Sequence, residues 1–341
     1  MVARFVVSRS KVLAQYAAVR ELADAVSYSV KTNPLLVSLL EEKTDSFFGI
    51  HFIHSLSYVQ NPSRVWFFAQ GWTEQELNEL FTHGVRSFVV DNENDLAMLL
   101  RYIEARDERI SLLLRMRLKE RTIHTERHFV FGFYAAQINE WIPKLRKNEK
   151  IARLGIHFHR KSENLSEWDF RDELGAVIDS AVLDSIDVLN MGGGIPVQYK
   201  NHPVDMLPHI FLKIRELREW LSERNVQLVI EPGRFIAAPC TKLEAVIRNI
   251  YGNTIIIDCS VYNAAMDTFV VPIRLLVEGE REAGEAYTVK GCTPDSLDVF
   301  RYRIYMDNPK IGDTIVFLNA GAYTYAADFC GLQKLETVFV D

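Results

Sequence analysis

The chain has 341 residues, of which 48% are apolar and 25% are charged, and its net charge is −6. This composition is ordinary for a soluble globular protein of one or two domains, and the charge gives no support to a nucleic-acid or anionic-membrane partner. No run approaches the ~18 uncharged apolar residues of a membrane span, and the first residues lack a secretory pattern. We therefore expect a cytoplasmic protein with reduced cysteines and no metal site, since the cysteines show no metal-ligand spacing (Cys240, Cys259, Cys292 and Cys330).

Short β-rich apolar runs alternate with longer amphipathic stretches from about residue 25 to residue 235. Eight such runs, nearly all followed by a helical pattern, predict a (β/α)8 barrel of the TIM type rather than an open sheet. Helices are expected at 73–84, at 92–105 and in the long stretch 163–183. The predicted strands are 25–31, 45–52, 64–69, 85–90, 109–116, 153–159, 185–191 and 226–231.

After Pro239 the chain consists of β-branched runs separated by Gly, Asn and Asp turns, without a long helix. This pattern predicts a mostly antiparallel β domain, and we expect the run 3–7 to pair with it. The predicted domains are therefore a barrel of residues 10–238 and a C-terminal β domain of residues 239–341 with 1–9. Its predicted strands include 242–249, 253–260, 268–278, 285–291 and 313–319.

Lys31 stands at the end of the first predicted barrel strand. The sites of such barrels lie at the carboxyl ends of the strands, and a lysine buried there is easier to deprotonate and can form an imine with a carbonyl group. Taken alone this is weak support, since most strand-end lysines reach solvent.

Three glycines, residues 192–194, follow the seventh strand, and their N–H groups can approach a phosphate closely. A flexible turn is the alternative there.

The eighth predicted strand ends in the sequence Glu-Pro-Gly-Arg, residues 231–234. The arginine can engage a phosphate, and a carboxylate beside a pyridine nitrogen keeps that nitrogen protonated, so that the ring accepts electrons. The alternative is a Pro-Gly turn with a surface ion pair.

His159 is predicted to end the sixth strand and to face the same way as His157. An imidazole in this position can stack on a planar cofactor. The alternative is a histidine of the core.

Taken in order, these motifs resemble the fold-type III pyridoxal-5′-phosphate (PLP) decarboxylases, which include ornithine, diaminopimelate, lysine and arginine decarboxylases and have an alanine-racemase-like barrel. The resemblance rests on Lys31 in a Val-Lys-x-Asn context, His-Phe-His, the glycine triad, Glu-Pro-Gly-Arg and a late Gly-Ala-Tyr at 321–323. It implies PLP as the cofactor and decarboxylation of a small (di)amino acid such as ornithine, lysine or diaminopimelate. The implied route passes through an external aldimine and a quinonoid, in amino-acid metabolism or polyamine biosynthesis.

The resemblance also implies roles for the matching residues. Lys31 would be the Schiff-base lysine, with Glu231 at the pyridine nitrogen, His159 stacked on the ring and Arg115 near the lysine. Segment 291–298 resembles a loop that the family donates across a dimer interface, which implies a homodimer with shared active sites. The implied phosphate ligands are Ser162, Gly193, Gly194, Arg234 and Tyr323.

Four positions depart from the family pattern. Pro294 occupies the position of a cysteine that helps to protonate the product carbon, and Cys292 occupies a proline position. We expect that Cys292 substitutes through a shifted loop, that another acid protonates the carbon, or that turnover is slow and error-prone. Gly49 and Ser55 stand where the family often has Asp and Glu.

The substrate-reading segment also differs from the family, since Leu275-Leu276 replaces a Tyr-Asp pair that grips a distal ammonium. We expect the substrate to meet Asp295 and Tyr262, and Arg274 is a candidate for a substrate carboxylate. A solvated or structurally paired arginine is the alternative for Arg274.

Two other functions are consistent with these motifs. An amino-acid racemase shares the fold, but racemases of this type place an arginine where this chain has Glu231, so decarboxylation is favoured. A non-enzymatic PLP-binding protein of the single-barrel kind would lack the C-terminal β domain that the sequence predicts here.

Overall fold

The computed structural model describes residues 2–68, 70–118, 131–324, 327 and 331–341. These residues form two compact units, which we name the barrel unit and the β unit. The barrel unit contains residues 17–195 and 206–232, and the β unit contains residues 1–16, 196–205 and 233–341. The predicted domain boundaries at residues 10, 238 and 239 stay predictions.

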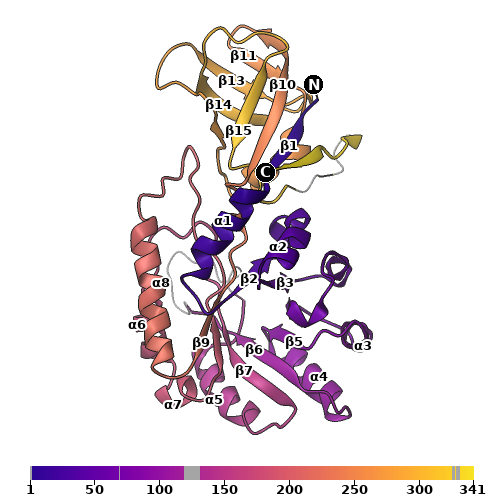
Figure 1. The fold of residues 1–341 in the computed structure, drawn as a ribbon, viewed down its shortest axis with the longest axis vertical. Helices are drawn as coiled ribbons and strands as arrows, with labels where there is room; N and C mark the ends of the chain where they lie inside the picture. The colour runs from indigo at the N-terminus through magenta and orange to yellow at the C-terminus, as the bar shows by residue number, and fades with distance from the viewer. Residues whose placement is uncertain (1, 69, 119–130, 325–326, 328–330) are drawn as a thin grey trace. The chain divides into compact units, whose positions relative to one another are not determined.

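Eight parallel strands close into a barrel, in chain order from β2 to β9, which confirms the predicted fold class (Figure 1). The ring is closed by pairing of β2 with β9, in register Ala25↔Val229. Each of the eight runs predicted from the sequence overlaps one of these strands, and seven contain it whole; β7 begins two residues before the predicted run 153–159. The bounds of the strands are Ala25–Ser29 (β2), Phe47–Ile50 (β3), Val65–Phe68 (β4), Ser87–Val90 (β5), Ile110–Arg115 (β6), Ile151–His157 (β7), Val188–Asn190 (β8) and Gln227–Ile230 (β9).

Helices follow most barrel strands. Those predicted at 73–84 and 92–105 are confirmed as α3 and α4, and Thr73 begins α3 with a capping box to Glu76. The single helix expected across 163–183 is wrong, because Ile178 is extended and separates α6 from α7. The bounds are Arg9–Arg20 (α1), Val37–Lys43 (α2), Glu74–Thr82 (α3), Glu93–Glu104 (α4), Ala135–Leu145 (α5), Phe170–Val177 (α6), Ser180–Leu183 (α7) and Leu207–Ser222 (α8).

Buried side chains from several barrel strands form one hydrophobic cluster, so the barrel interior is a packed core and not a channel. None of the described helices is long and apolar enough to cross a membrane. The central cluster comprises Trp66, Phe68, Val89, Leu113, Val188 and Val229.

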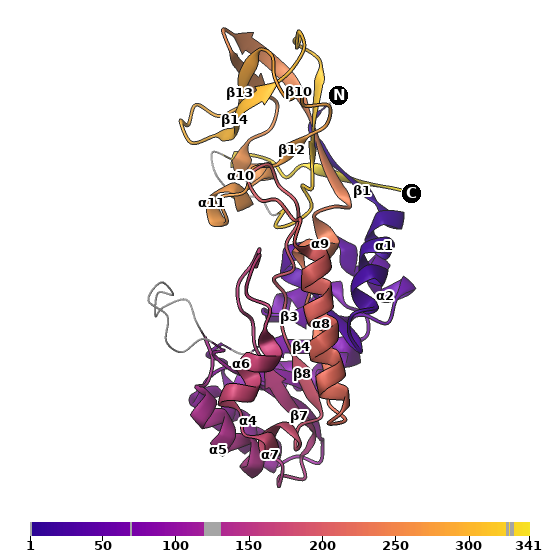
Figure 2. The ribbon, with the colours of Figure 1, turned by 90° about the vertical axis from the view of Figure 1, so that its left-hand side faces the viewer.

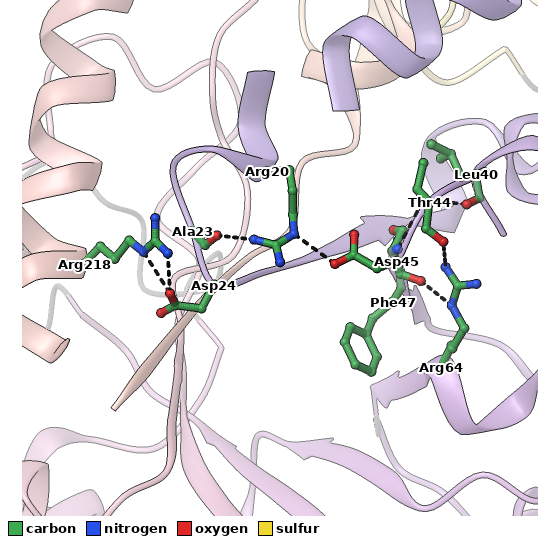
Figure 3. A network of polar contacts seen from close by, with 10 residues as sticks. Arg20, Ala23, Asp24, Leu40, Thr44, Asp45, Phe47, Arg64 and Arg218 are labelled. Carbon is green, nitrogen blue, oxygen red and sulfur yellow. Dashed lines mark hydrogen bonds and ion pairs between the residues drawn. The ribbon is translucent and has the colours of Figure 1, made fainter. Parts of the chain in front are cut away.

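The amino ends of β2 and β3 are fixed by three arginines (Figure 3). Arg218 of α8 bonds the Asp24 carboxylate at 2.8 Å, and the other oxygen of Asp24 accepts the Leu228 amide at 2.8 Å. Arg20 bonds Asp45 at 3.0 Å, while Arg64 donates to the Ser46 carbonyl oxygen at 2.7 Å. Polar contacts at this end of a barrel serve stability, since function lies at the opposite end of the strands.

The β unit contains an eight-stranded mixed sheet, parts of which are visible in Figure 2. β1 pairs with β10, antiparallel, which confirms the pairing predicted for residues 3–7, and it also pairs with β16, parallel. Sequence reasoning missed β14 and β16. The strands are Arg4–Ser8 (β1), Thr241–Tyr251 (β10), Thr254–Ile257 (β11), Leu276–Val277 (β12), Ala286–Lys290 (β13), Val299–Tyr305 (β14), Thr314–Leu318 (β15) and Glu336–Val340 (β16).

The strand predicted across 268–278 is wrong for most of its length. Only Leu276–Val277 pairs, as β12, whereas Asp267–Val270 forms the short helix α11. Pro272 lacks the N–H that a sheet ladder requires, so the chain between the two elements stays irregular. Two further short helices of this unit are Arg234–Ala237 (α9) and Val261–Ala264 (α10).

Gly155→Ala is expected to lower the free energy of unfolding by at least about 2 kcal/mol. A Cβ at this position of β7 would lie 2.0 Å from the backbone oxygen of Val188. The matched control is Gly175→Ala on α6, where the nearest atom, of Trp220, is 4.0 Å away; it should stabilise the protein by up to ~1 kcal/mol. Urea unfolding followed by circular dichroism measures the stability of both variants. Equal urea midpoints for Gly155→Ala and Gly175→Ala would contradict the close packing inferred at Gly155.

Candidate active site

Lys31 lies at the carboxyl end of the barrel, in the 3-10 turn Val30–Thr32 (η1) that follows β2. The prediction that this strand extends through Lys31 is wrong by two residues, because its pairing with β3 ends at Ser29↔Gly49. An Asn-Pro sequence favours a turn, and Asn33 begins a second one by accepting the Leu35 amide at 3.2 Å. The lysine therefore stands on a turn at the strand end.

The Lys31 amine lies among groups from several strands. Its Nζ is 3.4 Å from His51 Nε2. Burial lowers the pKa of Lys31, the positive charge of Arg115 lowers it further, and the negative charge of Glu231 opposes both. The side chain is accessible to solvent, since it lines an open cavity, but the surrounding protein still disfavours its charge. The amine is thus easier to deprotonate than an ordinary lysine and remains reachable from outside.

A cavity of about 550 Å³ opens beside Lys31, within the usual range for small-molecule sites. Polar groups and aromatic rings share its wall, and they come from the ends of successive strands. Among them are His51, Phe68, Asp91 and Arg115.

Glu231, directly after β9, is held by side chains from the two preceding strands. His157 Nε2 lies 3.1 Å from one carboxylate oxygen, and Asn190 Nδ2 donates to the other at 2.9 Å. Burial alone would raise the pKa of Glu231, but His157 and Asn190 outweigh burial and lower it. Burial lowers the pKa of His157. The pair is therefore an ionised carboxylate with a neutral imidazole that donates to it.

The prediction that His159 ends a strand is wrong. β7 ends at His157, because β8 offers no partner beyond Asn190. His159 Nδ1 instead accepts the Gly193 amide at 3.3 Å. Burial, followed by the charge of Arg115, lowers the pKa of His159 to about 3. Its ring is neutral at pH 7 and lies against the glycine triad.

The glycine triad is packed too closely for larger residues. Gly192 and Gly194 have φ of 69° and 106°, a region that favours glycine, and a Cβ at Gly193 would lie 2.5 Å from the Glu231 carbonyl oxygen. The Gly192 amide donates to Asn190 Oδ1 at 2.9 Å. The Gly194 amide donates to none of the described residues. The Gly194 amide is therefore available to a ligand. The Gly193 amide makes only a long hydrogen bond, 3.3 Å to His159, which a ligand could replace.

Sequence reasoning missed His51, which directly follows β3. Its ring stacks on Phe68, with centroids 4.7 Å apart and an angle of 7° between the planes. Burial, and then the charges of Lys31 and Arg115, lower the pKa of His51 to about 3. The rule that polar residues at carboxyl strand ends form the site of a barrel would have identified it.

Two of the predicted phosphate ligands lie together in the β unit. Arg234 is buried at the start of α9 and bonds the Asp267 carboxylate and, at 3.0 Å, the Tyr199 hydroxyl. Its guanidinium group also lies over the Tyr323 ring, 5.2 Å from the centroid. Sequence reasoning missed Asp267 and Tyr199, since neither stands in a recognisable motif. The arginine is thereby held rigidly as a charged group.

The loop 291–298 of the β unit is organised around the buried carboxylate of Asp298, which accepts the Thr293 amide at 3.0 Å and the Val261 amide at 2.9 Å. Cys292 is exposed on this loop, and burial followed by Asp298 raises its pKa, so the thiol keeps its proton at neutral pH. Asp295 accepts a hydrogen bond from the Tyr262 hydroxyl. The structure thus joins two of the predicted substrate residues.

The remaining predicted residues have simpler surroundings. Arg274 is half-buried; its guanidinium donates to the Ile273 carbonyl oxygen at 3.1 Å and lies 5.5 Å from the centroid of the Tyr302 ring. These contacts match the structurally paired alternative. Ser162 is exposed after β7. Cys330 lies outside the described residues.

The chain is similar in sequence to a known protein family and to several characterised relatives. The family model described as pyridoxal-dependent decarboxylase, pyridoxal binding domain, matches residues 11–238. An ornithine decarboxylase of Caenorhabditis elegans is 25% identical over 75% of this chain, and the chain spans 66% of that relative's length. A diaminopimelate decarboxylase of Vibrio cholerae is 26% identical over 93% of this chain and 81% of its own length.

Solved structures share the fold. The lysine/ornithine decarboxylase from Vibrio vulnificus, complexed with cadaverine, superposes with a TM-score of 0.84 at 20% identity, covering 100% of this chain and 95% of that one. A diaminopimelate decarboxylase from M. jannaschi also gives a TM-score of 0.84, at 18% identity, covering 99% of this chain and 86% of that one.

Proposed function

Since the chain belongs to the pyridoxal-dependent decarboxylase family, we propose that it binds PLP at the carboxyl end of its barrel and decarboxylates a small amino acid. The observation that carries this proposal is the position of Lys31: its amine lines a cavity, has a lowered pKa, and lies in the field of the ionised Glu231.

The residues present fit this cofactor. PLP requires an amine for its aldehyde, a carboxylate for its ring nitrogen, and donors for its phosphate. Lys31 and Glu231 supply the first two. For the third, the glycine triad has the close packing of a backbone cradle and at least one amide that donates to no described residue.

When bound, PLP supplies a conjugated ring that accepts the electron pair released as CO₂ leaves. The protein positions the cofactor and supplies the charged and neutral groups around it. Lys31 provides an amine that reaches its neutral form readily, Glu231 holds a proton on the ring nitrogen, and neutral His159 offers a flat surface beside the glycine triad. Because His157 and Asn190 fix the Glu231 carboxylate in advance, no reorganisation is needed as charge develops.

We further propose that Cys292 donates the proton that replaces the lost carboxylate, since its raised pKa keeps it a thiol. The roles predicted for Ser162, Arg234 and Tyr323 at the phosphate and for Arg115 near Lys31 stay predictions. So do the homodimer with shared active sites, the cytoplasmic location and a place in polyamine biosynthesis.

A diamino acid is the proposed substrate class. The Tyr262–Asp295 pair joins a phenol to an ionised carboxylate, because the hydrogen bond from Tyr262 lowers the pKa of Asp295. Such a pair suits a distal ammonium group and compensates for the absent Tyr-Asp pair at residues 275–276. The names of the relatives, ornithine and diaminopimelate decarboxylases, fit this class.

Lys31→Ala is expected to remove the visible absorbance of the bound cofactor and to lower the rate of CO₂ release by roughly 10³ or more. The reason is that Lys31 is the only lysine among the described residues that line the cavity. Lys147→Ala, a change of the same type in the exposed turn after α5, is the matched control. An absorbance band of wild-type intensity in Lys31→Ala would disprove the assignment.

Glu231→Gln is expected to lower kcat about 100-fold while cofactor content stays near that of the wild type. The neutral amide keeps the shape of the side chain but no longer holds a proton on the ring nitrogen. Paired kinetics and cofactor titration test this. A parallel loss of cofactor and turnover would mean that Glu231 serves binding alone.

A screen of amino acids with purified protein and added PLP is expected to give CO₂ release with ornithine, lysine, arginine or diaminopimelate. Chiral chromatography of the same mixtures separates decarboxylation from racemisation. Inversion of configuration without CO₂ would replace the proposal with the racemase. Cofactor binding without either reaction would indicate a non-enzymatic PLP-binding protein.

A further inference from the structure

His51 contacts the amine at the centre of the site but belongs to none of the sequence motifs. Its Nε2 lies 3.4 Å from Lys31 Nζ, and no other hydrogen bond of this amine to a described residue is present. Stacking on Phe68 of β4 fixes the plane of the ring. The geometry therefore aims one particular nitrogen at the amine.

The other ring nitrogen of His51, Nδ1, has no hydrogen-bond partner among the described residues. The tautomer of a histidine is set by the hydrogen bond that its second nitrogen makes. Since none is made here, Nε2 can accept a hydrogen bond from a charged ammonium or donate one to a neutral amine. A carboxylate at this place could only accept and would favour the charged amine.

We propose that His51 is the positioning residue of Lys31: its ring holds Nζ at the barrel mouth in both protonation states of the amine, without the negative charge that would keep the amine protonated. The inference rests on the proposed function, because it assigns His51 to the amine that is to carry the cofactor. No covalent step is added, and His51 gains or loses no net proton.

The surrounding charges agree with this role. Burial, Lys31, Arg115 and His157 all lower the pKa of His51, so the ring stays neutral at pH 7. For Lys31, Arg115 acts in the same direction as burial and Glu231 in the opposite one. The groups that face the pair are Arg115 from β6, His157 from β7, His159 after β7 and Glu231 after β9, with Asp91 after β5 acting on Arg115.

The test measures the amine itself in the full-length chain after removal of the cofactor. Trace acetic anhydride labels Lys31 in proportion to its neutral fraction, and peptide mass spectrometry gives the pH midpoint of labelling. In the wild type we expect a midpoint below that of an ordinary lysine, about 10.4. His51→Asp places an anion beside the amine, so its midpoint should rise by about one to three pH units and labelling at pH 8 should fall at least ~10-fold.

Two variants control for charge and shape. His51→Gln keeps a neutral donor and acceptor and should retain the wild-type midpoint. His209→Asp adds the same charge at an exposed position in the first turn of α8, outside the lining of the cavity, where solvent screening should leave the midpoint within about half a pH unit. Near-UV circular dichroism verifies that each variant is folded.

His51→Phe keeps the stack on Phe68 but removes the hydrogen bond. Its uptake of PLP, followed by stopped-flow absorbance, should be about tenfold slower than that of the wild type. A wild-type rate in His51→Phe, or equal midpoints in His51→Asp and the wild type, would overturn the role of His51. If the wild type itself takes up no PLP on Lys31, the proposed function fails, whereas the labelling midpoints still decide whether His51 governs the amine.

Discussion

The site depends on one buried anion. Glu231 keeps its charge inside the barrel mouth because His157 and Asn190 hydrogen-bond both of its oxygens, at 3.1 Å and 2.9 Å. An isolated carboxylate there would become protonated instead, since burial disfavours charge. The neighbouring His157 stays neutral because burial lowers its pKa, although the charge of Glu231 acts in the opposite direction. The same anion is a counter-charge for Lys31 and acts to raise the pKa of its amine.

One of the departures from the family pattern lies at the barrel mouth. Gly49 on β3 faces the same space as Glu231: a Cβ there would lie 3.4 Å from the Phe68 ring and 3.7 Å from a Glu231 oxygen. An aspartate in this position would bring a second carboxylate against the first, and the two could not both stay ionised easily. The chain has glycine at 49 and a neutral histidine at 51, so the partner of the lysine carries no charge.

The barrel unit and the β unit, each taken by itself, contain different kinds of polar groups. In the barrel unit the side chains are desolvated and act through altered protonation, as Lys31, His51 and His159 do. In the β unit the residues are held in defined pairs, Arg234 with Asp267 and Tyr262 with Asp295. The first set suits covalent and proton chemistry, and the second suits the recognition of charged ends of small molecules.

The barrel and the position of its chemistry could be read from the amino-acid pattern, because alternating β-rich and amphipathic runs have few packing solutions and parallel strands put all their carboxyl ends on one side. Lys31, the glycine triad and Glu231 could be identified in this way, as residues at strand ends. The ends of the strands themselves were predicted less well, as at Ser29 and His157, since a strand stops where its neighbour stops offering partners.

Which side chains pair with one another became apparent only in the folded chain. That His51 faces Lys31, that His157 and Asn190 hold Glu231, and that Tyr262 bonds Asp295 follow from contacts between residues 20 to 74 positions apart. The irregular chain before β12 was equally hidden, because a run of β-branched residues also permits a short helix when a proline interrupts the ladder. The protonation states of these groups follow from their burial and from these pairings. Both depend on segments that are far apart in the sequence.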